Sequence, residues 1–213
     1  MHVFDCTVLQ AEVTPCLLID GTHKFHIRSY LVVVENLSHP DLLEMFVYNR
    51  HEVRIASTPV TNDPSDRERA AHITNGSSSV TERRELLDNV PELSNRGLKD
   101  KLETFIASTF GLHLLPDMLG RVKYAASQDT DAASTKVRKF AVAGIDTMIC
   151  SDERIYLLEV NVNPSAPPES LVDPMFRDHL TGFLQDIIDL ITEKPYQNFI
   201  LAHDLLQRKG MLE

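Results

Sequence analysis

Two runs of apolar and β-branched residues, joined by a short polar stretch, constrain the fold of this chain more than any other feature. The runs are Phe140–Ile149 and Ile155–Asn161, and the polar stretch between them is Ser151–Arg154. Runs of this length and composition around a short polar turn are typical of a β-hairpin. The turn is closed symmetrically either by Asp152-Glu153 alone or by all four polar residues, and both closures give the same cross-strand pairing.

In that pairing Asp146 lies directly opposite Glu159, and both side chains project from one face of the hairpin. Asn161 is two residues beyond Glu159, so it shares this face. Facing carboxylates repel each other by an amount comparable to the roughly 0.2–1 kcal/mol that a favourable pair contributes. The rest of both strands is apolar, and an unpaired charge in such surroundings is costly. The pattern favours a cation held by oxygen ligands, which suits Mg²⁺; the alternative is a pair of half-exposed acids at the end of an ordinary hairpin.

The overall charge limits the class of ligand. The 213 residues carry a formal net charge of −10, whereas proteins that wrap a nucleic-acid backbone carry a basic excess. Nucleic acid is therefore not an expected partner, while a nucleotide stays compatible because Mg²⁺ can link acidic side chains to phosphates. A membrane is not expected either, because no apolar stretch approaches the roughly 18 residues needed to cross a bilayer.

The cysteines indicate the redox compartment. Cys6, Cys16 and Cys150 are widely spaced, odd in number, and form no CxxC pair. This spacing predicts neither a disulfide framework nor a zinc site, and it favours a reducing compartment. The N-terminus has no basic region followed by an apolar core, so it does not resemble a secretory signal. A cytoplasmic protein is the expectation.

The first quarter of the chain has the composition of β-strands. Cys16–Ile19 is a short apolar run before a turn at Asp20-Gly21, and longer runs follow at Lys24–Glu35, Leu42–Tyr48 and Val53–Ala56. Turn-forming residues separate these runs, so we interpret them as an antiparallel meander.

Alternation within the first long run separates its side chains into two faces. One face is expected to be core, with Phe25, Ile27 and Leu31, and the other carries polar groups on Lys24, His26, Arg28 and Tyr30. Together with Arg54 on a later strand, Arg28 suits recognition of a carboxylate or a phosphate. The alternative is a solvated strand face.

Helical spacing takes over from Ser94 onward. Apolar residues recur with a period of 3.6 at Leu98, Leu102, Phe105, Ile106 and Leu112, and Ser94 or Asn95 can serve as the N-cap. A second helix is expected from Asp173-Pro174 and a third from about Pro195 to Gln207. The polar segments 58–80 and 127–135 are expected to be loops. The predicted class is α+β, an antiparallel sheet with flanking helices.

Five short motifs occur in an order that resembles the tubulin–tyrosine ligase family, a branch of the ATP-grasp superfamily. They are Lys24-Phe25-His26-Ile27-Arg28, Val53-Arg54-Ile55-Ala56-Ser57, His72-Ile73-Thr74-Asn75, Gly144-Ile145-Asp146 and Leu158-Glu159-Val160-Asn161. Each motif is short, and it is their order along the chain that makes the resemblance specific. The resemblance covers the C-terminal half of the family's domain. Residues 1–213 are therefore expected to be the C-terminal part of an ATP-grasp domain, whose N-terminal lobes would lie upstream of Met1.

The resemblance implies ATP-dependent ligation of an amino acid (tyrosine, glutamate or glycine) to tubulin or another protein through an acylphosphate. It implies that Asp146, Glu159 and Asn161 bind Mg²⁺, and that Arg28 and Arg54 act near the substrate and the transferred phosphoryl group. ATP would be contacted by Gln10 along the adenine, by Lys24, and by Asn75 near the phosphates. Taken alone, the segment around Asn75 reads better as a simple turn. Association with the cytoskeleton is a further expectation of the resemblance.

Two positions depart from the family pattern. His26 stands where the family usually has aspartate, and Ala11 stands where lysine commonly follows the hinge glutamine. The first departure means that an acidic group is absent or displaced. Two other functions stay open: a degenerate module that binds nucleotide or tubulin without turnover, and an ATP-grasp ligase acting on a small metabolite. The motif around Lys24 favours the tubulin–tyrosine ligase branch over the latter.

Overall fold

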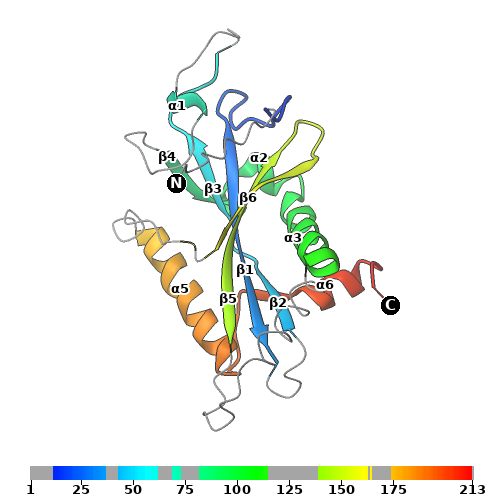
Figure 1. Ribbon diagram of the computed structural model, residues 1–213. Helices are drawn as coiled ribbons and strands as arrows, with labels where there is room; N and C mark the ends of the chain where they lie inside the picture. The colour runs from blue at the N-terminus through cyan, green and yellow to red at the C-terminus, as the bar shows by residue number, and fades with distance from the viewer. Residues whose placement is uncertain are drawn as a thin grey trace, which may run out of the picture.

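The computed structural model describes residues 12–36, 43–61, 69–72, 82–114, 139–162, 164 and 174–212. These residues form a seven-stranded antiparallel sheet with helices on both faces (Figure 1). This arrangement confirms the predicted α+β class with an antiparallel sheet and flanking helices. Within the described residues no helix is both long and apolar enough to span a membrane.

The central strand is β1 (Phe25–Glu35), and its two edges pair with different numbers of strands. On one side β5 (Phe140–Ile149) pairs along most of its length. On the other side β3 (Glu52–Ala56) pairs with the first four residues and β2 (Leu43–Tyr48) with the last five. The predicted meander is therefore wrong in its order, because β3 pairs with β1 and not with β2. An eleven-residue strand is long enough to accept two short strands end to end.

Three further strands complete the sheet. β4 (Glu82–Leu86) pairs with β3, β6 (Ile155–Val162) with β5, and β7 (Phe199–Leu201) with β2. Neither β4, with the polar sequence ERREL, nor the three-residue β7 has the apolar alternation that identifies a strand. β7 also corrects the predicted third helix, because α6 begins only at Ala202 and ends at Arg208.

One face of the sheet is covered by η1 (Leu87–Asn89), α2 (Pro91–Ser94), α3 (Leu98–Ser108), the π-helix η2 (Thr109–Leu114) and α6. The predicted apolar stripe of α3 is confirmed, since Leu98, Leu102 and Ile106 are fully buried. The predicted N-cap is wrong: α3 starts after Gly97, whose φ of 63° breaks it from α2. A left-handed residue interrupts the helical path, and glycine adopts that conformation without steric cost.

The opposite face is covered by α5 (Pro174–Ile191), which begins at the predicted proline. Alternate residues of β1 divide between the two layers: Ile27, Leu31 and Val33 join the core under α3, and Tyr30, Val32 and Val34 join the core under α5. Before Tyr30, the α5 face of β1 carries polar side chains instead. The candidate site therefore lies on this face, next to the part that α5 covers.

The two predicted loops, 58–80 and 127–135, lie largely outside the described residues. Of segment 58–80 the structure describes residues 58–61 and 69–72, and the latter form a helical turn, α1 (Arg69–His72), which the sequence pattern did not predict. Segment 127–135 lies outside the described residues, as does Asp173, the predicted cap of α5.

Candidate functional site

The polar side chains of β1 are buried, and β1 itself lies between strands β3 and β5 in this part of the sheet. His26 and Arg28 are each 6% exposed. Arg28 pairs in register with Glu52 of β3 on one side and with Asp146 of β5 on the other, and His26 pairs with Arg54. The prediction that one face of β1 carries the polar groups is confirmed, but the alternative of a solvated face is wrong. These groups are therefore largely removed from water.

Arg28 and Asp146 form a bidentate ion pair. Nη2 of Arg28 donates to Oδ2 of Asp146 at 2.7 Å, and Nε donates to Oδ1. Burial on its own would lower the pKa of Arg28 and raise that of Asp146, but the hydrogen bonds and mutual charge dominate. The pKa of Arg28 is therefore raised and that of Asp146 lowered. Both groups are held in their charged forms.

The β5–β6 hairpin confirms the predicted pairing of Asp146 with Glu159, although by another route. The amide of Cys150 donates to the carbonyl of Arg154 at 2.8 Å, so the loop contains three residues, and its last residue, Glu153, has a φ of 67°. This closure alone would shift the register by one residue. A β-bulge between Asp146 and Thr147 restores it, and both predicted symmetric turns are wrong.

Asn161 joins the two acids. Its Nδ2 donates to Oδ2 of Asp146 at 3.2 Å and to Oε1 of Glu159 at 3.0 Å. The apolar surroundings predicted from sequence hold on β5, where Asp146 is 4% exposed, but not on β6, where Val160 is 42% exposed. β6 pairs only with β5 among the described strands, and none of its side chains is fully buried. Three candidate ligands thus converge at the border between buried and exposed surface.

This group of residues fits Mg²⁺ together with a phosphate. Two carboxylates and an amide oxygen are hard ligands of the kind Mg²⁺ takes, and Mg²⁺ usually completes its shell with water and phosphate oxygens. The bidentate bond to Arg28 leaves lone pairs free on Asp146, because a carboxylate offers about four acceptor sites. Within the described residues, no three His, Cys, Asp or Glu side chains converge. Metal binding would therefore depend on Asn161 and on the ligand's own oxygens.

A second buried network, missed by the sequence analysis, surrounds Glu52. Arg54 Nη2 donates to Glu52 Oε2 at 3.3 Å, Tyr30 Oη donates to Oε1 at 3.1 Å, and His179 Nε2 of α5 lies 3.3 Å from Oε1. Burial would raise the pKa of Glu52, but His179, Arg54 and Tyr30 lower it to about 2. Nothing in the motif around Arg54 indicated that Glu52 would be ionised and buried. It supplies a carboxylate on the same face as His26, where the sequence pattern indicated an absent or displaced acid.

His26 is a neutral member of the cluster. Burial lowers its pKa to about 4, although the nearby Asp146 carboxylate opposes that change. Its Nε2 lies 3.8 Å from Oδ1 of Asp146. At neutral pH the imidazole is therefore uncharged, and Arg28 supplies the positive charge beside Asp146.

The residues predicted to contact ATP are only partly described. Lys24 lies just before β1, where its Nζ contacts the carboxylate of Glu12 and lies 2.9 Å from Nδ1 of His72. This contact brings the first residue of the predicted phosphate motif next to the predicted nucleotide lysine. Gln10 and Asn75 lie outside the described residues, so their roles stay predictions.

Gly144 gives Arg28 the space it occupies. A Cβ at this position would meet the Arg28 side chain at 3.2 Å and Cβ of Pro164 at 3.1 Å. Because Asp146 holds the guanidinium from two atoms, Arg28 has little freedom to move away. We expect Gly144→Ala to lower the free energy of unfolding by about 1–3 kcal/mol, measured by urea denaturation. As a control, Gly182→Ala in α5 meets nothing closer than 3.8 Å and is expected to stabilise by up to about 1 kcal/mol; equal effects of the two changes would contradict this account.

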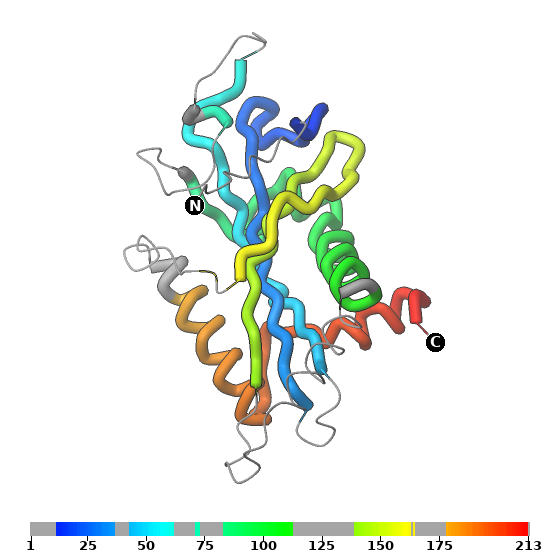
Figure 2. Tube along the Cα trace, viewed as in Figure 1, coloured from blue at the N-terminus to red at the C-terminus, as the bar shows by residue number. Residues whose placement is uncertain are grey.

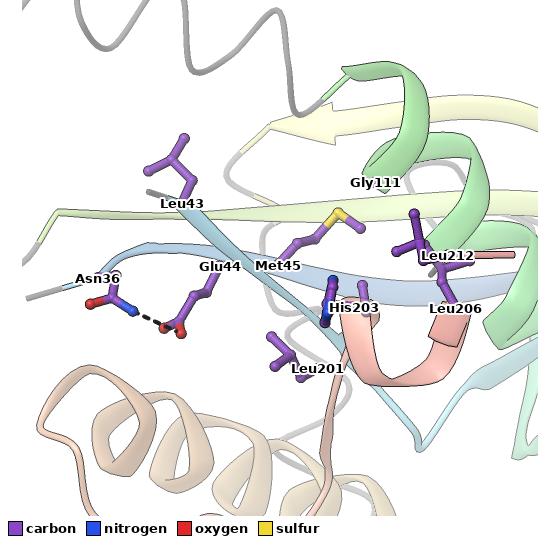
Figure 3. Close-up of a pocket in the computed structure, with 10 residues that line it drawn as sticks. Asn36, Leu43, Glu44, Met45, Gly111, Leu201, His203, Leu206 and Leu212 are labelled. Carbon is purple, nitrogen blue, oxygen red and sulfur yellow. Dashed lines mark hydrogen bonds between the residues drawn. The ribbon is translucent and has the colours of Figure 1, made fainter. Parts of the chain in front are cut away.

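A separate cavity lies at the other end of the sheet. It has a volume of about 290 Å³, and a hydrogen bond of 3.0 Å between Asn36 Nδ2 and Glu44 Oε1 lies at its edge (Figure 3). Its lining is mainly aliphatic and includes Leu43, Met45, Leu201, Leu206 and Leu212. None of the residues in the networks around Asp146 and Glu52 lines this cavity, so those networks are a separate feature.

Comparison with known proteins agrees with the motifs. The profile of the Tubulin-tyrosine ligase family matches residues 7–195, which span both polar networks and the β5–β6 hairpin. The chain belongs to the tubulin-tyrosine ligase family. No curated protein matches it. The family has an ATP-grasp-like fold, and its members are in general ATP-dependent ligases that use ATP and Mg²⁺ to join a carboxylate to an amine.

Membership of the tubulin-tyrosine ligase family gives the two networks a common context. The matched region contains all three candidate metal ligands and both arginines predicted to act in catalysis. The structure brings Arg28 to Asp146 and Arg54 to Glu52. Each candidate catalytic arginine therefore has its own buried carboxylate, and α5 reaches the second pair through His179.

Proposed function

We propose that this protein is an ATP- and Mg²⁺-dependent ligase that adds an amino acid to tubulin or another protein. The amino acid would be tyrosine, glutamate or glycine, and the acceptor carboxylate would be activated as an acylphosphate. The chain would act as the C-terminal lobe of an ATP-grasp domain, in the cytoplasm and beside the cytoskeleton.

The convergence of Asp146, Glu159 and Asn161 carries this proposal. One side-chain amide contacts both carboxylates, which places three oxygen-bearing groups of this chain around one point at the border of the sheet. Bound ATP would supply the phosphoryl group, and its Mg²⁺ ion would offset the charge of the phosphates. Asp146 and Glu159 would hold the metal, with the Asn161 amide turned to present its oxygen.

The arginines and Lys24 would position the other reacting groups. Nε of Arg54 is buried and has no hydrogen-bond partner within the described residues, so it retains a donor for a phosphate or carboxylate oxygen. Arg28 is held rigidly by Asp146 and would stabilise charge on the transferred phosphoryl group without needing to reorganise. Lys24 would contact the nucleotide, and Gln10 and Asn75 would bind the adenine and the phosphates.

A second function has a specific observation in its favour. Arg28 is paired with Asp146 and Arg54 with Glu52, so a large part of the cationic charge of the site is already balanced within the chain. A module with that balance would bind Mg²⁺–ATP or tubulin but stabilise a transition state poorly, because less net positive charge faces the phosphoryl group. Binding without turnover is the outcome that separates this function from the first.

Calorimetric titration with Mg²⁺–ATP tests the site. We expect saturable binding by the unmodified chain, and a loss of at least tenfold in affinity in Glu159→Ala, because one of two carboxylate ligands is removed. Glu159 is exposed, so this variant is expected to keep its free energy of unfolding within about 0.5 kcal/mol. The matched control is Asp152→Ala, which removes an exposed acid from the turn of the same hairpin and is expected to bind normally.

Turnover is tested separately by incorporation of labelled tyrosine, glutamate or glycine into tubulin in the presence of Mg²⁺–ATP. Incorporation that Glu159→Ala abolishes would support the ligase. Binding without incorporation, and without ADP release in the presence of any of the three amino acids, would favour the binding module. The absence of measurable heat at millimolar Mg²⁺–ATP would contradict the ligase and a module that binds nucleotide.

A further inference from the structure

Two cysteines that are far apart in sequence face each other in the structure. Cys16, which precedes β1, and Cys150, which directly follows β5, are partners in an isolated antiparallel bridge. The flanking amides close the bridge: Leu17 N donates to the Ile149 carbonyl at 2.8 Å, and Ser151 N donates to the Pro15 carbonyl at 3.0 Å. These bonds lie outside the cysteine pair, so it is a non-hydrogen-bonded pair, the closer of the two antiparallel types.

That geometry suits a disulfide. Residues in a non-hydrogen-bonded antiparallel pair have Cα atoms about 4.5 Å apart with side chains on the same face. A disulfide requires a Cα separation of roughly 4.4–6.8 Å. Both thiols are reduced in the structure. We infer that Cys16 and Cys150 form a reversible cross-strand disulfide when the protein meets a peroxide, and that this bond is a redox modification site.

The two thiols differ in solvent accessibility, and this difference indicates which of them an oxidant reaches first. Cys16 is partly exposed. Burial raises the pKa of its thiol, and the nearby charge of Lys24 opposes part of that rise. Cys150 is only 2% exposed. Cys16 is therefore the thiol that a small oxidant reaches first, and Cys150 reacts second.

The chemistry balances with hydrogen peroxide as the oxidant. The Cys16 thiolate attacks one peroxide oxygen, the O–O bond breaks, and one water leaves after proton transfer, giving a sulfenic acid. The sulfur of Cys150 then attacks the sulfur of Cys16, the S–S bond forms, the S–O bond breaks, and a second water leaves. Two thiols are oxidised as one peroxide is reduced to two waters.

The bond would join two parts of the candidate site. Residues 12–22 lead into Lys24 and β1, while the turn at Cys150–Arg154 connects Asp146 on β5 with Glu159 on β6. The two segments lie side by side at one end of the sheet (Figure 2). A covalent link here would hold the segment before Lys24 against the metal-site hairpin and close a long loop of chain. Closing a long loop restricts the unfolded chain and so stabilises the fold.

Oxidation of the Cys6→Ser chain tests this inference, because Cys16 and Cys150 are then the only cysteines. After treatment with hydrogen peroxide we expect loss of two hydrogen atoms in the intact mass and a monomer on a non-reducing gel. Peptide mapping should identify a Cys16–Cys150 cross-link. Tm is expected to rise by roughly 5–15 °C and to return on addition of dithiothreitol. None of these readouts requires nucleotide binding, so they are independent of the proposed function.

Two variants in the same background complete the test. Cys16→Ser, at the partly exposed position, and Cys150→Ala, at the buried one, should each abolish both the mass loss and the rise in Tm. The inference is overturned if the mass loss persists in Cys16→Ser. It is also overturned if Cys16 is converted to sulfinic acid with no cross-link, or if the product is a disulfide-linked dimer.

Discussion

Replacing Asp146 with alanine is expected to lower the free energy of unfolding by about 3–5 kcal/mol, because the variant leaves the Arg28 guanidinium buried without its partner. The two side chains are only 8% and 6% exposed, so water cannot take the place of the lost carboxylate. Urea denaturation of the purified variant measures the change. The same variant should also lose Mg²⁺–ATP binding, because it removes the better-buried of the two acidic residues proposed to hold the metal.

A double variant separates the structural role of Asp146 from its role in binding. Arg28→Met combined with Asp146→Leu removes both charges and keeps similar volumes, so most of the lost stability should return. Mg²⁺–ATP binding should stay absent in the double variant, because the ligand is still missing. If the double variant were no more stable than Asp146→Ala, the ion pair would not be the reason for the loss. If it bound Mg²⁺–ATP with normal affinity, Asp146 would not be a ligand.

Glu52→Gln is expected to destabilise the protein in a pH-dependent way. The pKa of Glu52 is lowered from 4.5 to about 2 in the folded chain. Its ionised form therefore contributes stability at every pH above 4.5, and that contribution is lost as the pH falls from 4.5 towards 2. The full contribution is about 3 kcal/mol, from roughly 1.4 kcal/mol for each unit of pKa. Glutamine resembles the protonated acid, so the difference between the two proteins should be about 3 kcal/mol at pH 7 and narrow below pH 4.5.

Urea denaturation of both proteins at several pH values between 3 and 7 measures this difference. The matched control is Glu85→Gln on the neighbouring strand β4, a position that is only partly buried. It is expected to change the free energy of unfolding by no more than about 0.5 kcal/mol. A difference for Glu52→Gln that stays constant across the pH range would show that the lost interaction is not that of an ionised carboxylate.

Local patterns were enough to predict most of the elements around the site. The predicted runs match five strands, each with both ends within one residue of the prediction: β1, β2, β3, β5 and β6. The reason is that alternation and β-branched composition act over a few residues and match the two-residue repeat of a strand. The facing of Asp146 and Glu159 was predicted correctly from a symmetric turn, but in the structure it results from a three-residue turn and a β-bulge whose register shifts cancel.

Features that depend on distant contacts were not predictable in the same way. The turn of the hairpin and its β-bulge compensate each other, and no pattern in a single sequence indicates such a compensation. β4 and β7 are strands because neighbouring strands offer them hydrogen bonds, not because their own residues prefer that conformation. Glu52 could not be identified because its partner His179 is distant in sequence, on α5.

The hairpin from Phe140 to Val162 shows which features follow from the local sequence and which depend on the tertiary structure. By itself the sequence determined that two strands would pair and that Glu159 and Asn161 would share one face, because side-chain direction in a strand is a local property. The β-bulge that brings Asp146 to the same face was not determined in this way. Only the tertiary structure decided that Arg28 would neutralise Asp146, that Glu159 would stay exposed, and that Cys150 would face Cys16. Those contacts join segments separated by more than a hundred residues, and burial and charge pairing between such segments depend on how the whole sheet assembles.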